Sequence, residues 1–285
     1  MNTREITMNV MRAGATCAAL ACWAAGALAQ QCPGDLGTIA KGKLTMSINA
    51  TTPPTQFIDE TGKFKGLNID LGNELAKRLC LEPAYVNIAF EAHIPGLQSG
   101  RWDMIDTSLY YTVERSKIMH LIPYGVQALA LIAPAGNPKG IAKPEDLAGK
   151  AVGVEIAGFE ERNLREINAK QVAAGLPAMT IRVFNTYGET FQALQAGQVD
   201  SVFAGDASGR FYQEKGRFTM AATGLLPGTP QALATVNPKL AQAVVDALNA
   251  MNADGTFGKL MEAWGATKAD QWKLWPGSFK FYYAP

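Results

Sequence analysis

Leu44-Thr45-Met46-Ser47-Ile48 is the stretch that decides the fold, together with the two segments that follow it. Its alternation of apolar and polar residues predicts a strand. Residues 69–79 carry Leu71 and Leu75 at helical spacing, and residues 84–90 have the composition of a second strand. Strand, helix and strand in this order are typical of a parallel sheet that is covered by helices.

The same alternation of patterns returns after residue 150. The expected strands are 152–154, 180–184 and 199–203, and the expected helices are 160–173 and 188–196. A chain of 285 residues with 48% hydrophobic composition is long enough to bury two cores. The sequence therefore predicts two α/β lobes, with strands on either side of Gly125 and around Ala232 carrying the chain from one lobe to the other and back.

The first 29 residues have the features of a secretory signal peptide. Two arginines precede an uncharged, alanine-rich stretch at 13–29, which ends in the small-x-small pattern Ala27-Leu28-Ala29. The stretch is too short for a comfortable membrane span, which needs about 20 strongly apolar residues. A lipid anchor on Cys22 or Cys32 is the alternative, although both positions lack the usual flanking residues. We expect this segment to direct secretion.

Cleavage after residue 29 would change the charge and the number of cysteines. It removes two of the 26 basic and one of the 25 acidic residues, which leaves 24 of each and gives no indication of a nucleic-acid partner. Cys32 and Cys80 remain as a pair in an oxidising compartment, which favours a disulfide. A helix running back antiparallel to the strand at 44–48 brings the two cysteines near each other. Two unpaired buried thiols are the alternative.

Candidate ligand contacts follow from the expected strands, because open α/β sheets bind small molecules beyond the carboxyl ends of their strands. Four loops qualify: 49–56, 107–115, 155–160 and 204–208. Asp106 is also notable, because a carboxylate on a buried strand needs a partner. That partner is either a second cationic group on the ligand or a structural bond to a neighbouring loop.

Short motifs occur along the chain in a fixed order. They are Gly42-Lys43-Leu44, Pro53-Pro54, Gly66-Leu67-Asn68-Ile69-Asp70-Leu71, residues 94–103, Thr112-Val113-Glu114-Arg115, Pro123-Tyr124, residues 146–154, Gly197-Gln198-Val199-Asp200, residues 254–260 and Trp264-Gly265. In this order they resemble the solute-binding proteins of bacterial ABC importers for polar amino acids, over nearly all of the chain after residue 40.

The resemblance implies an α/β, two-lobe periplasmic-binding-protein fold of type II with a hinged cleft between the lobes. Lobe one is expected at 30–126 and 230–285, and lobe two at 127–229. The resemblance also implies that Arg115 holds a ligand carboxylate with two parallel hydrogen bonds, helped by Ser108 and Thr112. Tyr110 stands where the family has a small hydroxyl residue.

Three more positions depart from the family pattern. Phe159 replaces a hydroxyl residue at the start of a helix, where free main-chain N–H groups attract anions. Asp206 comes one residue later than the aspartate that holds the ligand ammonium group, so it faces either the pocket or solvent. Thr52 replaces an aromatic lid. With Tyr110, these changes favour a solute with a planar or substituted portion over the common polar amino acids.

The leading functional hypothesis is a periplasmic receptor, and a monomer, that binds an amino-acid-like solute and delivers it to an ABC permease with its ATPase. It needs no cofactor, metal or catalytic residue. The alternative is a periplasmic dehydratase-type enzyme, with Glu155 or Glu160 as a general acid. A receptor domain that feeds a sensor is a third possibility. His93 and His120 lie away from the four loops and are interpreted as scaffold residues.

The aromatic C-terminal segment at 272–285 has two interpretations. It is either a flap packed on lobe one or an exposed docking patch for a partner.

Overall fold

The computed structural model describes residues 32–266, which contain one large and one small β-sheet. The large sheet has the strand order β5-β1-β6-β11-β7-β10-β8-β9, and the small one has the order β2-β3-β4. The large-sheet strands are β1 (Lys43–Ile48), β5 (Glu82–Asn87), β6 (Met104–Tyr110), β7 (His120–Pro134), β8 (Ala151–Glu155), β9 (Thr180–Phe184), β10 (Ser201–Gly205) and β11 (Phe218–Thr235). The small-sheet strands are β2 (Thr51–Thr52), β3 (Gln56–Ile58) and β4 (Phe64–Lys65).

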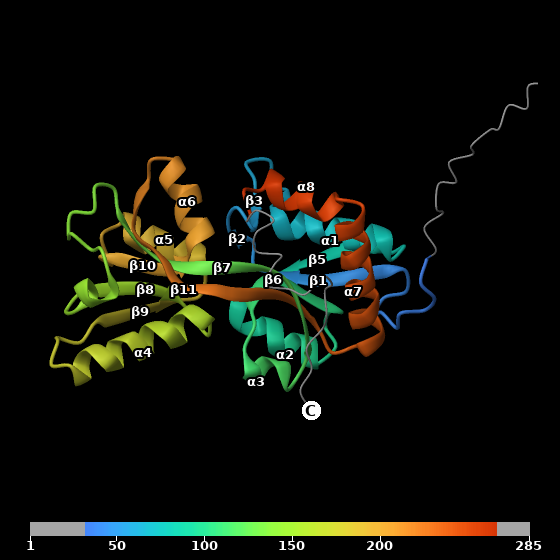
Figure 1. The fold of residues 1–285 in the computed structure, drawn as a ribbon, viewed down its shortest axis with the longest axis horizontal. Coiled ribbons are helices and arrows are strands. Elements are labelled where there is room, and N and C mark those ends of the chain that lie inside the picture. The colour runs from blue at the N-terminus through green and yellow to red at the C-terminus, as the bar shows by residue number, and fades with distance from the viewer. Residues whose placement is uncertain (1–31, 267–285) are drawn as a thin grey trace, which may run out of the picture. The chain divides into compact units, whose positions relative to one another are not determined.

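Two long antiparallel strands, β7 and β11, lie in the middle of the large sheet (Figure 1). Their pairing runs from His120 opposite Thr235 to Pro134 opposite Phe218 and contains several register shifts. The parallel strands β5, β1 and β6 lie on one side of this pair, and the parallel strands β10, β8 and β9 lie on the other. This is the two-lobe type II arrangement, with lobe one built on β1, β5 and β6 and lobe two on β8, β9 and β10.

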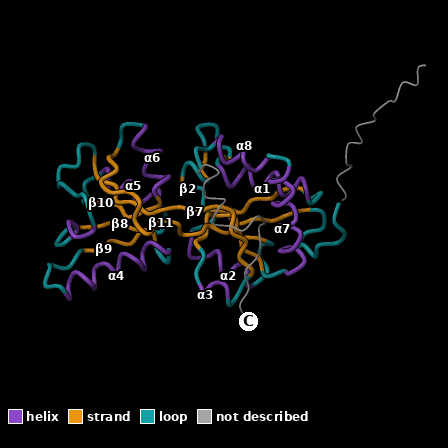
Figure 2. The backbone as a smooth tube through the Cα atoms, in the orientation of Figure 1, coloured by secondary structure: helices purple, strands orange, loops and turns teal. Residues whose placement is uncertain are grey.

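Helices cover both faces of the sheet in each lobe (Figure 2). They are α1 (Leu67–Arg78), α2 (His93–Gln98), α3 (Val113–Ser116), α4 (Phe159–Ala173), α5 (Tyr187–Gln195), α6 (Asp206–Glu214), α7 (Pro238–Ala253) and α8 (Thr256–Ala263). Two short 3-10 helices, η1 (Phe90–Ala92) and η2 (Pro144–Leu147), complete the set. In lobe one, α1, α7 and α8 form a core against one face, while α2 covers the other. In lobe two, α4 covers one face, and α5 and α6 cover the other.

The expected fold class is confirmed, and the expected strands and helices are present with small shifts at their ends. β9 has the expected bounds, and α4 begins one residue earlier than expected. The strand expected at 84–90 ends at Asn87, and Phe90 begins η1 instead. β10 lies two residues later than expected, because Asp200 still belongs to the turn and bonds through its main-chain N–H and its carboxylate to Ala151.

The glycine of the motif at 66–71 has a structural reason. Gly66 precedes α1 with φ of 126°, a conformation that favours glycine. A Cβ at this position would lie 2.3 Å from the carbonyl oxygen of Thr55. Gly66 therefore lets α1 begin close to the loop before β3, and the buried side chains of Leu71 and Leu75 then pack into the lobe-one core.

The disulfide between Cys32 and Cys80 is confirmed, and the alternative of two free thiols is excluded. The two Cα atoms are 5.6 Å apart. Cys80 follows the C-terminal end of α1, and its main-chain N–H bonds to the carbonyl of Lys77. The disulfide joins the end of this helix to the segment that precedes β1.

Two expectations fall outside the described part of the chain. These are the signal peptide at 1–29 and the packing of the segment at 272–285. Within 32–266, no helix combines the length and apolar character that a membrane crossing requires.

Candidate functional site

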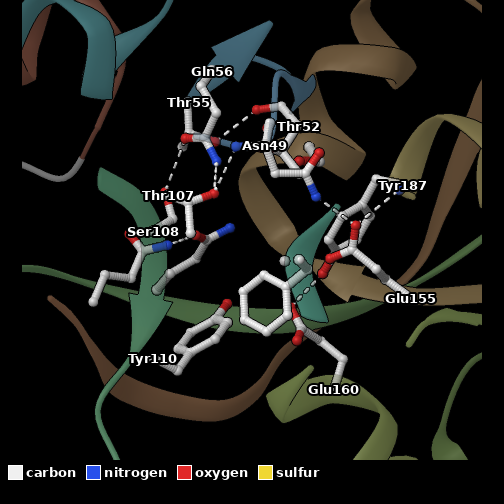
Figure 3. Close-up of a pocket in the computed structure, with 15 residues that line it drawn as sticks. Asn49, Thr52, Thr55, Gln56, Thr107, Ser108, Tyr110, Glu155, Glu160 and Tyr187 are labelled. Carbon is white, nitrogen blue, oxygen red and sulfur yellow. Dashed lines mark hydrogen bonds between the residues drawn. The ribbon is translucent and has the colours of Figure 1, made fainter. Parts of the chain in front are cut away.

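A pocket lies beyond the carboxyl ends of β1, β6, β8 and β10 (Figure 3). The residues that line it are Asn49, Thr52, Thr55, Gln56, Phe90, Thr107, Ser108, Tyr110, Gln127, Glu155, Glu160, Tyr187, Gly205, Ser208 and Gln231. All four loops expected from the strand pattern contribute to it. Phe90, Gln127, Tyr187 and Gln231 come from other elements, and sequence reasoning missed them.

The lobe-one wall of the pocket is a network of polar side chains around Ser108. Ser108 has φ of 55°, an uncommon conformation for a residue other than glycine. Its hydroxyl donates to Asn68 Oδ1 over 3.1 Å and accepts from the hydroxyl of Tyr124 over 3.2 Å. Gln56 Nε2 donates to Thr107 Oγ1 over 3.1 Å. These bonds hold the wall in place, so the strained backbone of Ser108 is stabilised by its surroundings.

Asp106 belongs to the same network but lies beneath the pocket. Its Oδ1 accepts from Asn68 Nδ2 over 2.8 Å, so a structural bond is present, as in the second of the two alternatives for this residue. Its Oδ2 is buried and has no hydrogen-bond partner in the described part of the chain. Burial raises the pKa of Asp106 to about 7, and the bond from Asn68 only partly offsets this rise.

We expect Asp106→Asn to stabilise the protein above neutral pH. Below about pH 4, Asp106 is protonated in both the folded and the unfolded state. Between its usual pKa of 3.8 and about 7, the unfolded state loses this proton and the folded state keeps it, so the free energy of unfolding falls as pH rises. The full shift corresponds to about 4 kcal/mol, and we expect about half of it, because side chains rearrange around the ionised group. Urea unfolding of both proteins at pH 5 and pH 8 measures this difference in the free energy of unfolding. The same change with pH in the wild type and in Asp106→Asn would contradict this expectation.

The lobe-two wall carries two buried carboxyl groups, Glu155 and Glu160. Glu155 Oε1 accepts from Asn49 Nδ2 over 2.6 Å and from the main-chain N–H of Tyr187 over 3.1 Å. The hydroxyl of Tyr187 donates to Glu160 Oε1. Figure 3 shows Glu155, Glu160 and Tyr187 together on one side of the pocket. The bond from Asn49, which follows β1, joins the two lobes across the pocket.

Both carboxyl groups ionise less readily than usual. Burial raises the pKa of Glu155 well above its ordinary value, and the charge of Glu160 raises it further. Burial also raises the pKa of Glu160, while bonds from Tyr187 and from its own main-chain N–H act in the opposite direction. The carboxyl group of Glu160 therefore lies at the N-terminal end of α4. This is where the free N–H groups beside Gly158 were expected to receive a ligand carboxylate.

Arg115 lies beside the pocket but is not one of its lining residues. Its Nη1 donates to the carbonyl oxygen of Tyr110 over 2.7 Å, and its guanidinium carbon lies 5.6 Å from the centre of the Phe90 ring. Thr112 caps α3 by accepting the N–H of Arg115, so its hydroxyl has a structural role. Burial lowers the pKa of Arg115 to about 10, so the guanidinium keeps its charge at neutral pH.

The remaining expected residues divide into two groups. Thr52 and Tyr110 line the pocket, whereas Phe159 and Asp206 do not. The ring of Phe159 packs against Tyr110, with centroids 4.9 Å apart. The carboxylate of Asp206 accepts a hydrogen bond from Arg210 Nη1 over 2.8 Å, one turn later in α6. Asp206 is 9% exposed and is thus buried, and its Oδ2 is already paired.

The pocket contains no described residue with a positive charge. Elsewhere in 32–266, no three His, Cys, Asp or Glu side chains form a group that could hold a metal ion. What the pocket offers a ligand is carboxyl groups on the lobe-two wall, amide and hydroxyl groups on both walls, and the ring of Phe90. This set suits a polar solute with several hydrogen-bond donors.

Comparisons with known proteins agree with this architecture. The family described as bacterial extracellular solute-binding proteins, family 3, matches residues 44–267. The L-cystine-binding protein TcyJ of Escherichia coli K12 is 27% identical over 228 residues, which cover 79% of this chain and 83% of that protein.

Two solved structures are similar along their whole length. An ancestral arginine-binding protein bound to arginine has a TM-score of 0.72 and 31% identity, covering 79% of this chain and 98% of its own. The ancestral amino-acid-binding protein AncCDT-1, a precursor of cyclohexadienyl dehydratase, has a TM-score of 0.68 and 27% identity, covering 78% of this chain and 95% of its own.

Proposed function

Because the chain belongs to the bacterial extracellular solute-binding proteins of family 3, we propose that it is the periplasmic amino-acid-binding component of an ABC importer. The observation that carries the proposal is the polar pocket between β1 and β6 of lobe one and β8 and β10 of lobe two. The similarity to an L-cystine-binding protein and to an arginine-binding structure supports an amino-acid-like ligand. The partners are a permease and its ATPase, and the receptor acts as a monomer.

We propose that the ligand is enclosed by closure of the lobes about β7 and β11. Lobe one then comprises 30–126 and 230–285, and lobe two comprises 127–229, after export directed by a signal peptide at 1–29. Two contacts from lobe one to lobe two support such a closed form: the bond from Asn49 to Glu155, and the rings of Phe57 and Phe211 with centroids 5.8 Å apart. Hinge closure around a ligand is a known motion of two-lobe binding proteins.

We propose that Arg115, Ser108, Tyr110 and Thr52 contact the ligand. Arg115 supports this role through its place beside Phe90 and through the guanidinium donors that its bond to Tyr110 does not use. Thr112 and Phe159 contribute indirectly, by capping the helix of Arg115 and by packing against Tyr110. A role for Asp206 requires that the ligand reach its Oδ1 or displace Arg210 from its Oδ2.

A thermal-shift screen tests the proposal. The mature protein is screened against the standard amino acids, cystine, and N-substituted and aromatic amino acids. A true ligand at a hundred times its dissociation constant stabilises the folded state by about 2.7 kcal/mol, which raises the unfolding temperature by several degrees. Nucleosides and sugars serve as controls. No shift with any amino acid or derivative would overturn the proposed function.

The enzyme hypothesis is favoured by one observation. Glu155 and Glu160 have raised pKa values in a pocket, and such carboxylic acids can act as general acids. The similarity to a precursor of a dehydratase, which is itself a binding protein, is consistent with either function. Chromatography after incubation of the protein with a cyclohexadienyl carboxylate separates the two. We expect the compound to be recovered unchanged.

A further inference from the structure

The two carboxyl groups of the lobe-two wall lack a counter-charge inside the pocket. Glu155 is 2% exposed and Glu160 is 6% exposed, yet the described residues that line the pocket carry no positive charge. The nearby cation is Arg115, whose charge acts on Glu160 and whose Nη1 is bonded to the carbonyl of Tyr110. Buried carboxylates are costly unless they are paired. Without a ligand the two groups avoid this cost by staying protonated, and a ligand is the remaining source of a counter-charge for their ionised form.

Two polar atoms around these groups are available for a ligand. Glu155 Oε1 already accepts two bonds, but its Oε2 has no hydrogen bond to a described residue. The hydroxyl of Tyr110, a residue only 5% exposed, is buried without a hydrogen-bond partner in the described part of the chain. Figure 3 draws Tyr110 and Glu160 near each other, and the charge of Glu160 acts on this hydroxyl. A buried hydroxyl without a partner costs about 1 to 3 kcal/mol, so the apo pocket favours a ligand that supplies one.

One oxygen of the carboxylate to which the family resemblance assigned an ammonium group is bonded within α6. Asp206 is bonded to Arg210 within α6, and only its neighbours Gly205 and Ser208 line the pocket. The acidic groups that do face the pocket are Glu155 and Glu160. The place for a positive charge has therefore moved from the start of α6 to the end of β8 and the start of α4.

We propose that Glu155, Glu160 and the hydroxyl of Tyr110 form a subsite for a cationic nitrogen of the ligand, an ammonium or a guanidinium group. The inference rests on the proposed function, because it concerns the ligand of the same pocket. The nitrogen donates charge-assisted hydrogen bonds to the carboxylates, which are stronger than bonds between neutral groups. The hydroxyl oxygen of Tyr110 accepts a further bond from it. A solute without a positive charge would leave these acceptors unpaired.

Binding of a cation at this subsite releases protons. The cation favours the ionised form of both carboxyl groups, which burial otherwise keeps protonated. The groups that face Glu155 are Asn49, Tyr187 and the two acids Glu160 and Glu189, and the acids disfavour its ionisation. Affinity for a cationic ligand therefore rises with pH over the range in which the two carboxyl groups titrate.

The groups that face Glu160 act in both directions. The charge of Arg115 and the hydroxyl of Tyr187 favour its ionisation, while burial opposes it. Tyr110 faces it with a hydroxyl whose own pKa is raised by burial and by the charge of Glu160, so this hydroxyl stays neutral. Burial thus opposes the ionisation of both acids, and a cation favours the ionised form of both.

Calorimetry with matched probes tests the subsite. L-Arginine, Nω-methyl-L-arginine and agmatine carry a charged guanidinium group. L-Citrulline lacks the guanidinium charge, and Nα-acetyl-L-arginine lacks the ammonium charge. We expect the wild type to bind at least one of the two probes that lack a charge at least 30-fold more weakly than L-arginine. This ratio of affinities measures the charge preference. Glu155→Gln and Glu160→Gln, which keep shape and one acceptor oxygen, should reduce that ratio below threefold. Glu166→Gln, an exposed residue of α4 outside the pocket, is the matched control and should leave the ratio unchanged.

Three results would overturn the inference. One is equal binding of the charged and neutral probes by the wild type, and another is loss of the charge preference in Asp206→Asn but not in the glutamine variants. The third is no heat with L-arginine, Nω-methyl-L-arginine or agmatine at 1 mM. If the thermal-shift screen has meanwhile found a neutral or acidic amino acid that binds, the proposed function stands and this inference alone fails. Proton release, measured in buffers of different ionisation enthalpy, provides a readout independent of affinity.

Discussion

Arg115→Ala is expected to weaken binding of the ligand by a factor of about thirty to several thousand. The loss of one partner of a desolvated charge pair costs about 2 to 5 kcal/mol. The guanidinium is held by the carbonyl of Tyr110 and lies over the ring of Phe90, so its position beside the pocket is fixed before the ligand arrives. Its pKa of about 10 keeps it charged under the conditions of any ordinary binding experiment.

Arg115→Lys separates charge from geometry. A lysine keeps the charge but loses the planar set of donors, so it should recover only part of the affinity. Arg165→Ala is the matched control, because Arg165 is an exposed arginine that pairs with Glu161 within α4. Calorimetry with the ligand from the screen gives the affinities, and circular dichroism checks the fold. A change below threefold in a folded Arg115→Ala protein would contradict the assignment.

The fold could be predicted from the sequence because its signals are local and periodic. The strand at 44–48 and the leucines of α1 follow the two periods of strand and helix, and the structure has both elements. The continuity of β7 and β11 could not be predicted in the same way. Their fifteen and eighteen residues pair with several register shifts, and such pairing depends on tertiary contacts that a single strand pattern does not record.

The loops of the site could be predicted, but the directions of their side chains could not. The rule that ligands bind beyond strand ends identified Asn49, Glu155 and Gly205 through their loops. Tyr187 was missed because it begins a helix, and Gln127 because it lies inside a long strand. The direction of the Asp206 side chain could have been predicted. An aspartate and an arginine four positions apart on a helix commonly pair, as Asp206 and Arg210 do on α6.

The double variant Cys32→Ser, Cys80→Ser is expected to lose about 4 kcal/mol of stability. The disulfide closes a loop with a sequence separation of 48 residues, and in the chain-entropy model a loop of this length restricts the unfolded state by about that amount. Urea unfolding of the oxidised protein, the reduced protein and the double variant measures the change. The reduced protein and the double variant should share one lower midpoint. A midpoint equal to that of the oxidised protein would show that the bond contributes nothing.

The same bond should have little effect on ligand binding. Neither cysteine lines the pocket, and the bond joins the end of α1 to the segment before β1, whereas the pocket lies beyond the opposite, carboxyl end of β1. Thiol titration of the denatured, unreduced protein should find no free cysteine, which establishes the starting state. We then expect the double variant, measured well below its unfolding temperature, to bind the ligand within threefold of the wild type. A larger loss would mean that the bond also holds the polar wall around Ser108, through the position of α1.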